Sequence, residues 1–344
     1  MTVSIGEDFA RQADPFRREL LAHCYRMLGS VHDAEDLVQE TLLRAWRASG
    51  RFDSERASLR TWLHRIATNA CLTALAGRSR RPLPSAIAGP SEDIERPLVR
   101  TEVPWLEPMP DAMVWAERAD PAAVAVSRSS LRLAFVAALQ LLPPRQRAIL
   151  ILREVLELPA AEVADMLATT PAAVNSALQR ARARLAGVAE DQIGEPAAPG
   201  LRATVDAYVA AFENADITAL TRLLTADAVL EMPPMAVWYA GRENYGRFIA
   251  WVWAMRGTDW RMVRAAANGQ PAVAAYVRTG DEYRLNTLQV FTVTRAGIGR
   301  NVVFAEPGLF ATFGLAPRLG LAPRPGLAPR LGLAPRPGPA AGAR

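Results

Sequence analysis

The sequence predicts a multidomain protein in which two all-α modules, the second with a helix-turn-helix, precede an α+β domain. The chain has 344 residues, more than one ordinary domain of about 100 to 150 residues accounts for. Apolar residues recur at helical spacing through the first 80 residues and again over 129–186, whereas alternating segments begin only near residue 228. Residues 1–83 carry 13 Arg against ten acidic residues, residues 84–127 three against eight, and residues 128–186 eight against four. Two basic modules therefore flank an acidic connector.

Composition excludes several classes of protein. All 40 basic residues are Arg, and Ala and Pro are abundant, which indicates a GC-rich genome, so Arg content alone is weak evidence for nucleic-acid binding. No apolar run approaches the roughly 18 residues of a membrane span, and no secretory signal begins the chain, so we expect a cytoplasmic protein. The two cysteines and three histidines lack metal-ligand spacing, so no metal and no cofactor is expected.

The first module is predicted to contain three helices around one small core. The first covers about residues 15–28 and ends at Gly29, a suitable C-cap. The second begins at residue 32 or 33 and continues to about residue 48, with Trp46 in its apolar stripe. The third begins after Ser58, a good N-cap.

The second of these helices places polar residues opposite its apolar stripe. Periodicity alone favours a solvated face there. However, HDAEDLVQETLLRAWRA, followed by FDSERASLRTWLHRIATNACL, resembles region 2 of bacterial sigma factors of the extracytoplasmic-function type over about residues 15–81. The resemblance implies that this face docks onto core RNA polymerase and that the third helix, with the loop before it, reads the separated strands of the minus-ten element. The implied polymerase-binding residues are Asp36, Gln39, Glu40 and Arg44.

The third helix has a polar side that suits this role. Arg side chains can hold phosphates, and an Asn can distinguish a base. Trp62 lies on the apolar stripe and is expected in the core rather than under a base. The candidate DNA-binding residues here are Arg60, His64, Arg65, Asn69, Arg78 and Arg80.

Residues 160–185 have the layout of a helix-turn-helix. Thr170 is placed to cap the second helix, with Pro171 at its first position, and the turn position usually filled by Gly is Ala168, where a left-handed conformation costs about 1 kcal/mol. An ordinary helical hairpin remains an alternative reading. Asn and Gln can pair with adenine, and Arg with guanine or phosphate. The second helix would present Ala172, Asn175, Ser176, Gln179, Arg180 and Arg182.

The helix pair and the LPPRQRAILILREV before it resemble region 4 of the same sigma family, which binds the duplex minus-thirty-five element. Both regions occur in the family's order. The connecting EVPWLEPMPD resembles a Trp-Leu-Pro-Glu-type stretch of sigma factors that carry an extra C-terminal domain. This implies that Trp105, Leu106 and Glu107 form a docking segment for that domain; a local anchor is the alternative.

Residues 201–313 predict two helices followed by an antiparallel sheet. The segments FENADITALTRLLTADAVLEMPP and NGQPAVAAY resemble the SnoaL-like branch of the nuclear-transport-factor-2-like fold, a cone formed by helices packed across a curved sheet. Some members are isomerases, cyclases or hydratases, and Glu231 or Glu306 could point into such a cone; both could equally lie on the outer face, paired or solvated. No acid–base pair has a defined spacing, so we expect no enzyme and instead a regulatory domain with a small-molecule ligand. Five aromatic residues could line the site, although core packing is the default for most of them: Trp238, Tyr239, Tyr245, Trp251 and Trp253.

The predicted protein is thus a sigma factor that binds core RNA polymerase and promoter DNA, modulated in cis by its third domain. Two alternatives stay open: a conventional helix-turn-helix regulator, and a bifunctional protein whose C-terminal domain is an isomerase or cyclase. The GLAPR repeats, with Pro in every unit, predict a disordered tail. The predicted segments are region 2 (10–82), an acidic Pro-rich linker (83–127), region 4 (128–187), the SnoaL-like domain (200–313) and the tail (314–344).

Overall fold

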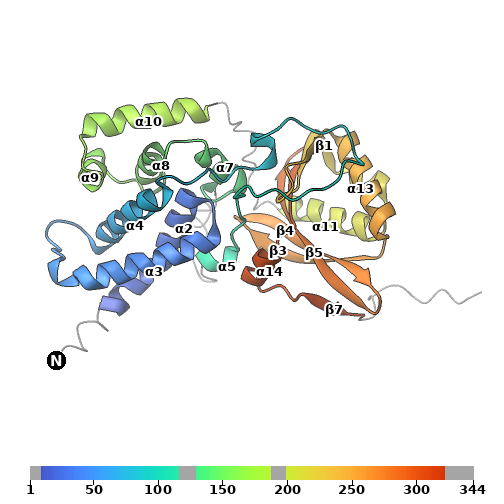
Figure 1. Ribbon diagram of the computed structural model, residues 1–344, viewed down its shortest axis with the longest axis horizontal. Coiled ribbons are helices and arrows are strands. Elements are labelled where there is room, and N and C mark those ends of the chain that lie inside the picture. Colours follow the sequence, from blue (N-terminus) through green and yellow to red (C-terminus); the bar gives the residue numbers. More distant parts are fainter. Residues whose placement is uncertain (1–8, 116–128, 187–198, 322–344) are drawn as a thin grey trace, which may run out of the picture.

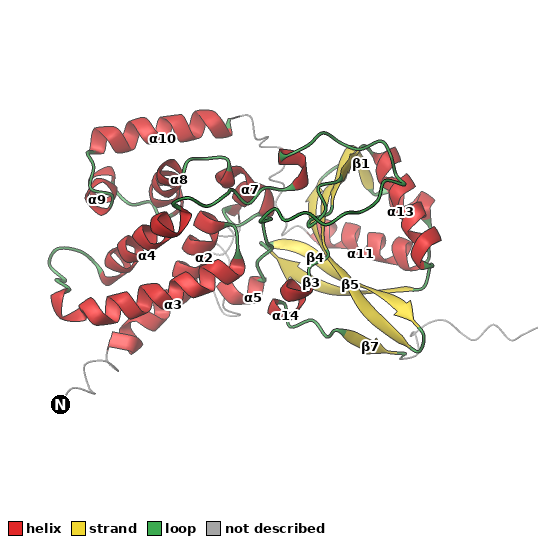
Figure 2. Cartoon of the chain, viewed as in Figure 1, coloured by secondary structure: helices red, strands yellow, loops and turns green. Residues whose placement is uncertain are grey.

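The computed structural model describes residues 9–115, 129–186 and 199–321 (Figure 1). Two helical modules lie at one end of the molecule, and a sheet with its covering helices lies at the other (Figure 2). A long extended segment leaves the first module, passes along the sheet domain and returns. In the described part of the chain no helix is both long and apolar enough to cross a bilayer.

The first module begins and ends its helices close to the predicted residues. Gly29 follows α2 with a left-handed φ of 69°, which confirms the predicted C-cap. Helix α3 starts slightly earlier than predicted because Ser30 caps it, its Oγ accepting the Asp33 N–H at 3.1 Å. Ser58 caps α4 in the same way through Thr61. The three helices are α2 (Arg17–Leu28), α3 (Val31–Ala48) and α4 (Leu59–Leu75).

The second module contains the predicted helix-turn-helix. Thr170 Oγ1 accepts the Ala173 N–H at 3.2 Å, and Ala168 adopts the predicted left-handed conformation with φ of 49°. Val174 and Leu167 face inward, at 0% and 5% exposure. The turn therefore keeps its shape without glycine. The helices are α7 (Leu133–Gln140), α8 (Pro144–Leu150) with a π-helical turn (Ile151–Val155), α9 (Ala160–Met166) and α10 (Pro171–Leu185).

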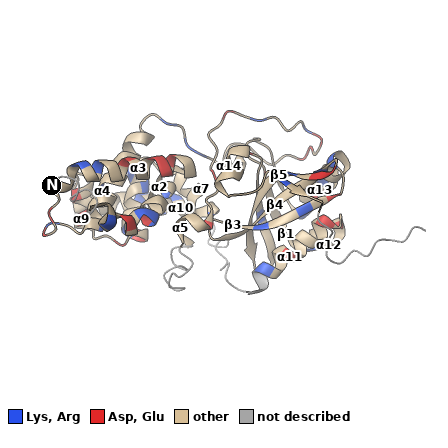
Figure 3. Cartoon of the chain, turned by 90° about the horizontal axis from the view of Figure 1, so that it is seen from below, with Lys and Arg blue, Asp and Glu red and all other residues tan. Residues whose placement is uncertain are grey.

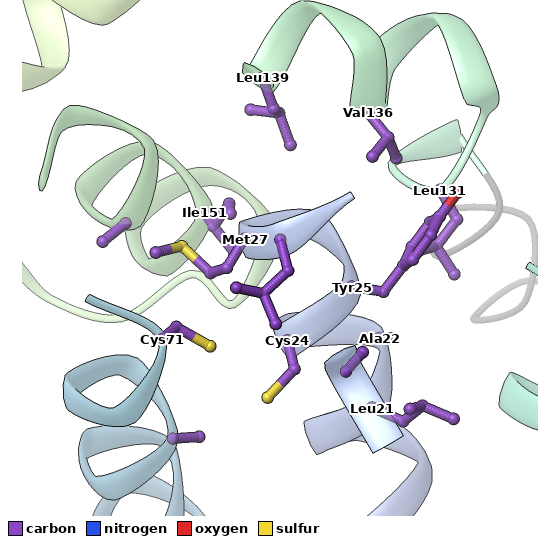
Figure 4. Close-up of a cluster of buried hydrophobic side chains, with 14 of the residues drawn as sticks. Leu21, Ala22, Cys24, Tyr25, Met27, Cys71, Leu131, Val136, Leu139 and Ile151 are labelled. Atoms are coloured by element: carbon purple, nitrogen blue, oxygen red, sulfur yellow. The ribbon is translucent and has the colours of Figure 1, made fainter. Parts of the chain in front are cut away.

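The two helical modules pack directly against each other through α2. Figure 4 shows Met27 and Cys24 of α2 among side chains of both modules, including Cys71 of α4 and Ile151 of the π-helical turn. Both cysteines are buried and free, as expected for small apolar residues. Arg147 of α8 is also buried and donates hydrogen bonds to the Met27 carbonyl and to Gln140 Oε1 (2.7 Å).

The C-terminal domain is the predicted α+β unit. Its main sheet has the strand order β2-β1-β6-β5-β4-β3. The expectation of an antiparallel sheet is wrong at one place, because β1 and β6 pair in parallel. The elements are α11 (Pro199–Glu213), α12 (Ile217–Arg222), β1 (Leu224–Glu231), β2 (Trp238–Ala240), α13 (Arg242–Arg256), β3 (Trp260–Ala267), β4 (Gln270–Thr279), β5 (Glu282–Thr294), β6 (Gly297–Phe304), α14 (Pro307–Thr312) and β7 (Arg318–Gly320).

The two faces of this sheet have different neighbours. Helices α11 and α13 cover one face, where Phe291 and Val273 belong to the core that these helices complete. On the other face, Leu288, Val302 and Phe304 belong to the same continuous buried cluster as the helical modules. Because successive strand residues face opposite sides, each central strand contributes to both cores.

Residues 82–110, here called the strap, are fixed rather than a loose linker. The Ser91 N–H donates to the Trp238 carbonyl at 2.8 Å, and the Thr101 N–H to the Pro234 carbonyl at 3.1 Å. Ile94 is buried in the core beneath α11 and α13. The strap then returns to the first module, where the Leu106 N–H donates to the Pro82 carbonyl at 3.1 Å. It leads into α5 (Asp111–Val114).

The prediction of a disordered tail is wrong for its first residues, because residues 318–320 form a strand. Strand β7 pairs antiparallel with β5, with Leu319 opposite Tyr283. The Leu285 N–H also donates to the Pro317 carbonyl. The first GLAPR repeat therefore forms a short strand because it pairs with the free edge of β5. Residues 322–344, and the linker prediction for 116–128, lie outside the described residues.

Candidate functional site

The polar residues predicted to bind polymerase lie together on the outer face of α3. Asp36, Gln39 and Arg44 are exposed, and Glu40 is half-buried. Arg44 Nε donates to Glu40 Oε1 at 2.6 Å, the expected i,i+4 pair. Within the described residues, none of the four forms a hydrogen bond or ion pair with another element, so the whole group is available to a partner.

Two large apolar side chains extend this face, and the sequence analysis missed both. Leu43 is 40% exposed and Trp46 is 50% exposed. The expectation that Trp46 belongs to the buried stripe is wrong: Ala45 fills the core position beside it at 0% exposure. An exposed Trp costs apolar hydration and suits a binding surface. We call Asp36, Gln39, Glu40, Leu43, Arg44 and Trp46 the α3 face.

The polar side of α4 is smaller than predicted. Arg65 and Asn69 are exposed, but His64 is 1% exposed and its ring packs edge-on against His23 at 5.3 Å. His64 is therefore removed from the candidate DNA surface. Burial lowers its pKa and keeps the ring neutral. Arg60 forms an ion pair with Glu19 of α2, which fixes its guanidinium near the surface.

Aromatic side chains gather at the start of α4. Trp62 is partly buried and lies between Phe52 of the preceding loop, at 5.0 Å, and Phe9, at 6.4 Å between ring centroids. Trp62 is thus packed among other rings, as its place on the apolar stripe predicts, although it lies at the edge of the core.

The segment after α4 brings three Arg residues to a groove between the modules. Arg78 and Arg81 both contact Asp33 Oδ2, at 3.2 and 2.9 Å, whereas Arg80 is exposed and has no partner among the described residues. The groove has a volume of about 280 Å³ and also includes the buried Arg147. Its excess of positive charge suits a phosphate backbone.

Helix α10 presents its predicted residues to solvent. Arg182 forms an ion pair with Glu154 of the π-helical turn, and Arg180 is not paired with any described residue. Figure 3 shows that basic and acidic residues are interspersed along the helical modules, so the position of each residue carries more information than the total charge. The exposed residues of this α10 face are Ala172, Asn175, Ser176, Gln179, Arg180 and Arg182.

The segment expected to dock the extra domain contacts two parts of the molecule: Trp105, Leu106 and Glu107 bind the first helical module, and the residues that follow, Met109 to Asp111, contact the C-terminal domain. Trp105 and Leu106 are buried at 8% and 0% exposure. Glu107 lies at the N-terminus of α3, where its Oε2 accepts from Ser30 Oγ at 2.8 Å and from the Val31 N–H at 2.9 Å. A carboxylate at this position also interacts favourably with the helix dipole.

Asn268 provides the contact from the C-terminal domain. It lies in the turn between β3 and β4, with φ of 58°. Its Oδ1 accepts the Met109 N–H at 2.9 Å, and its Nδ2 donates to Tyr25 Oη at 2.8 Å and to the Leu131 carbonyl at 2.7 Å. One buried side chain thus joins the sheet domain, the strap, α2 and the approach to α7. We call Tyr25, Glu107, Met109, Leu131 and Asn268 the domain junction.

The cone of the C-terminal domain contains a cavity of about 120 Å³, but neither candidate carboxylate lines it. Leu230 and Met232 line it, so Glu231 between them faces the other side of the sheet and contacts Arg300 at 2.7 Å. Burial raises the pKa of Glu231, and Arg300 opposes that shift. Glu306 forms an ion pair with Arg100 of the strap.

The aromatic residues singled out in the sequence also lie elsewhere. None of the five is in the cavity wall, whose aromatic side chains are Phe212, Phe248 and Trp260. Tyr239, Tyr245 and Trp253 are core residues. Over the described residues, no group of His, Cys, Asp or Glu is arranged to hold a metal ion.

Comparison with known proteins agrees with this architecture. Family models match residues 13–81 (Sigma-70 region 2), 132–185 (Sigma-70, region 4) and 205–300 (SnoaL-like domain). The ECF RNA polymerase sigma factor SigG of Mycobacterium tuberculosis (strain H37Rv) is 51% identical over 308 residues, 88% of this chain and 82% of that protein. SigJ of the same organism is 29% identical over 72% of this chain and 68% of its own length.

A solved structure has the same fold over almost the whole length. The crystal structure of M. tuberculosis extracytoplasmic function sigma factor SigJ has a TM-score of 0.62 at 23% identity and covers 89% of this chain and 99% of that one. The combination of two helical modules with a sheet domain is therefore found in another protein.

Proposed function

The chain belongs to the extracytoplasmic-function (ECF) RNA polymerase sigma factors, and from this we propose that it directs promoter-specific initiation while its C-terminal domain restrains the two sigma modules. Its full-length relatives are sigma factors rather than enzymes. The site of action is then the cytoplasm, where core RNA polymerase and promoter DNA are its partners.

Polymerase binding is assigned to the α3 face. An apolar pair, Leu43 and Trp46, beside the charged group Asp36, Glu40 and Arg44 gives the composition of a protein interface, in which a Trp or Arg anchor is surrounded by polar residues. Every residue of the face except Glu40 is exposed, so binding at this surface requires no prior rearrangement of the first module.

Promoter binding is divided between the two modules. Arg65, Asn69, Arg78 and Arg80 are exposed on or just after α4, where they can contact the minus-ten strand and its phosphates. The α10 face has the dimensions and residue types of a helix that reads the major groove of the minus-thirty-five element.

The two modules cannot reach both promoter elements in the packed arrangement. Elements at minus ten and minus thirty-five are separated by about 25 base pairs, or roughly 85 Å of duplex at ~3.4 Å per base pair. A compact body of roughly 150 to 180 residues is only about 40 Å across. The contact between α2, α7 and α8 therefore has to open before both elements are engaged.

The domain junction is the observation that carries the regulatory part of the proposal. Asn268 donates to α2 and at the same time to Leu131, two residues before α7, and Glu107 joins the strap to the start of α3. The C-terminal domain thus stabilises the packed arrangement of both sigma modules. Release of the junction would favour the open one.

Point variants test this better than truncation, since removal of the domain would uncover the side chains of the helical modules and the strap that share one buried cluster with Leu288, Val302 and Phe304. We expect Asn268→Gly to raise the affinity of the full-length chain for core polymerase, or its transcription from a cognate promoter, severalfold. Unchanged affinity and unchanged transcription in a folded Asn268→Gly protein would remove the regulatory claim. Failure of the unmodified chain to bind core polymerase would remove the sigma-factor claim.

A further inference from the structure

The cavity in the C-terminal domain has a mainly apolar lining that includes three aromatic side chains. It lies between α13 and the inner face of the sheet, with Phe212, Phe248 and Trp260 among its lining residues. Among the described lining residues there is no Asp or Glu, and the single charged one, Arg256, is exposed. The interior therefore offers no ion pair to a buried ligand.

Two buried amides give this apolar chamber one polar end. Asn301 and Gln289 line the cavity at 0% and 5% exposure. Asn301 Nδ2 donates to Tyr245 Oη at 2.7 Å and to Gln289 Oε1 at 2.9 Å. These bonds join the two amides to each other and to Tyr245.

The same bonds leave one acceptor and one donor unused. Asn301 Oδ1 is buried and has no hydrogen-bond partner among the described residues. Gln289 Nε2 likewise makes no hydrogen bond to a described residue. Buried polar groups are nearly always paired, and leaving one unpaired costs stability, so the pair is suited to a bound group that both donates and accepts.

The strap forms part of the cavity wall. Leu98 lines the cavity, whereas its neighbour Val99 is 66% exposed. Met235 also lines the cavity, and it forms a β-bridge with Arg100 of the strap. Anything bound in the cavity therefore touches the segment that connects the two sigma modules.

We propose that this cavity binds a small uncharged ring compound that carries a hydroxyl group, of about the size of phenol, and that Leu98 closes over it. A volume of about 120 Å³ is near that of an engineered protein cavity that accepts benzene. A hydroxyl donates to Asn301 Oδ1 and accepts from Gln289 Nε2. The consequence for transcription, through the strap, rests on the proposed function; the binding itself does not.

Calorimetric titration of the full-length protein with p-cresol, toluene and benzoate tests the binding. We expect saturable binding of one p-cresol per chain and at least tenfold weaker binding of toluene, which has the ring and methyl group but no hydroxyl. Absence of p-cresol binding, equal affinity for toluene, or a preference for benzoate would each overturn the proposal.

Variants separate the roles of the amide pair and the strap. Gln289→Leu should reduce p-cresol affinity to that of toluene while toluene affinity stays unchanged. If Gln289→Leu does not fold, the comparison of p-cresol with toluene on the unmodified chain still decides whether the hydroxyl is recognised. Leu98→Ala should speed p-cresol release severalfold, measured by NMR line broadening, and Val99→Ala should not. Equal release rates would remove Leu98 as the closing residue. Since polymerase is absent from these measurements, their failure is distinct from failure of the sigma-factor function.

Discussion

Asn268 in the β3–β4 turn donates a 2.8 Å hydrogen bond to Tyr25 of α2, 243 residues earlier in the chain. The Tyr25 hydroxyl in turn donates to the Glu107 carbonyl at 2.7 Å. These two bonds connect the C-terminal domain, the first sigma module and the strap in a buried line. Burial raises the pKa of Tyr25 above its ordinary value of 10.0, so the hydroxyl keeps its proton and remains a donor at physiological pH.

Replacing Asn268 should loosen the junction. Both Asn268→Gly and Asn268→Ala remove three side-chain hydrogen bonds, which together stabilise the contact by roughly 3 kcal/mol. Asn268→Ala should cost about 1 kcal/mol more, because its φ of 58° is strained for Ala and free for Gly. Hydrogen exchange at the Met109 and Leu131 region measures the loosening. Equal protection in both variants and the unmodified chain would contradict the role of Asn268.

Replacing Glu107 with Gln should destabilise the start of α3. The carboxylate accepts two hydrogen bonds at that helix terminus and interacts with its dipole, so we expect a loss of about 1 to 2 kcal/mol in the free energy of unfolding of the helical modules. Glu102→Gln is the matched control, since Glu102 is exposed in the same strap and its side chain forms no hydrogen bond or ion pair with a described residue. Urea unfolding that cannot separate the two variants would show that Glu107 is not structural.

The α3 face should be important for polymerase binding and unimportant for stability. Trp46→Ala removes a half-exposed side chain, so the free energy of unfolding should change by less than about 0.5 kcal/mol while affinity for core polymerase falls at least tenfold. Met255→Ala, at 51% exposure on the far domain, is the control for loss of an exposed apolar group. A Trp46 variant that binds core enzyme as tightly as the control would place the interface elsewhere.

The α10 face should show two kinds of DNA contact. Asn175 near the helix N-terminus is positioned for a base edge, so Asn175→Ala should relax sequence preference at one promoter position by about 1 to 3 kcal/mol. Arg180→Ala should weaken binding to all DNA sequences about equally. It should also lower the slope of log affinity against log salt concentration by about one, which corresponds to one released counterion. Fluorescence titration of duplexes at several salt concentrations distinguishes them. Identical effects from both variants would argue against a reading helix in this orientation.

Stability should fall in mild acid because two histidines are buried without charge. Burial, followed by repulsion from His64, lowers the pKa of His23 well below its ordinary value of 6.5. As pH falls below about 6.5, His23 becomes protonated in the unfolded chain but stays neutral in the folded protein. The free energy of unfolding therefore falls by up to about 1.4 kcal/mol per pH unit.

A His23→Gln variant checks this sign. Its free energy of unfolding should decline less between pH 6.5 and 5 than that of the unmodified chain, and both should follow the same course above pH 7.5, where neither state protonates the ring. Equal slopes in acid would mean that His23 becomes protonated in the folded protein.

Local signals in the sequence predicted the helical modules well. Gly29, Ser58 and Thr170 end or begin helices for reasons that involve only neighbouring residues, and Ala168 takes its left-handed conformation because the helix-turn-helix requires it. Long-range effects were not predictable in the same way. His64 has polar chemistry but packs on His23, and a Pro-rich acidic segment becomes a fixed strap because strands far along the chain bind it.

The candidate site shows the same division. The charged residues of the α3 face and the α10 face follow from helical periodicity and from family resemblance. The exposure of Trp46 could not be predicted from periodicity, since its position in α3 is compatible with either the apolar stripe or the edge of that stripe. Asn268 is part of a motif that the sequence analysis used only to recognise the domain, and nothing local indicates that its side chain reaches α2.

Sequencing the 5′ ends of transcripts made in vitro by core RNA polymerase with the purified full-length chain tests whether the chain directs promoter-specific initiation. We expect discrete start sites downstream of shared minus-ten and minus-thirty-five sequences; Trp46→Ala should abolish these transcripts, and Asn268→Gly should increase their yield. Start sites no different from those of core enzyme alone would contradict the proposed sigma-factor function.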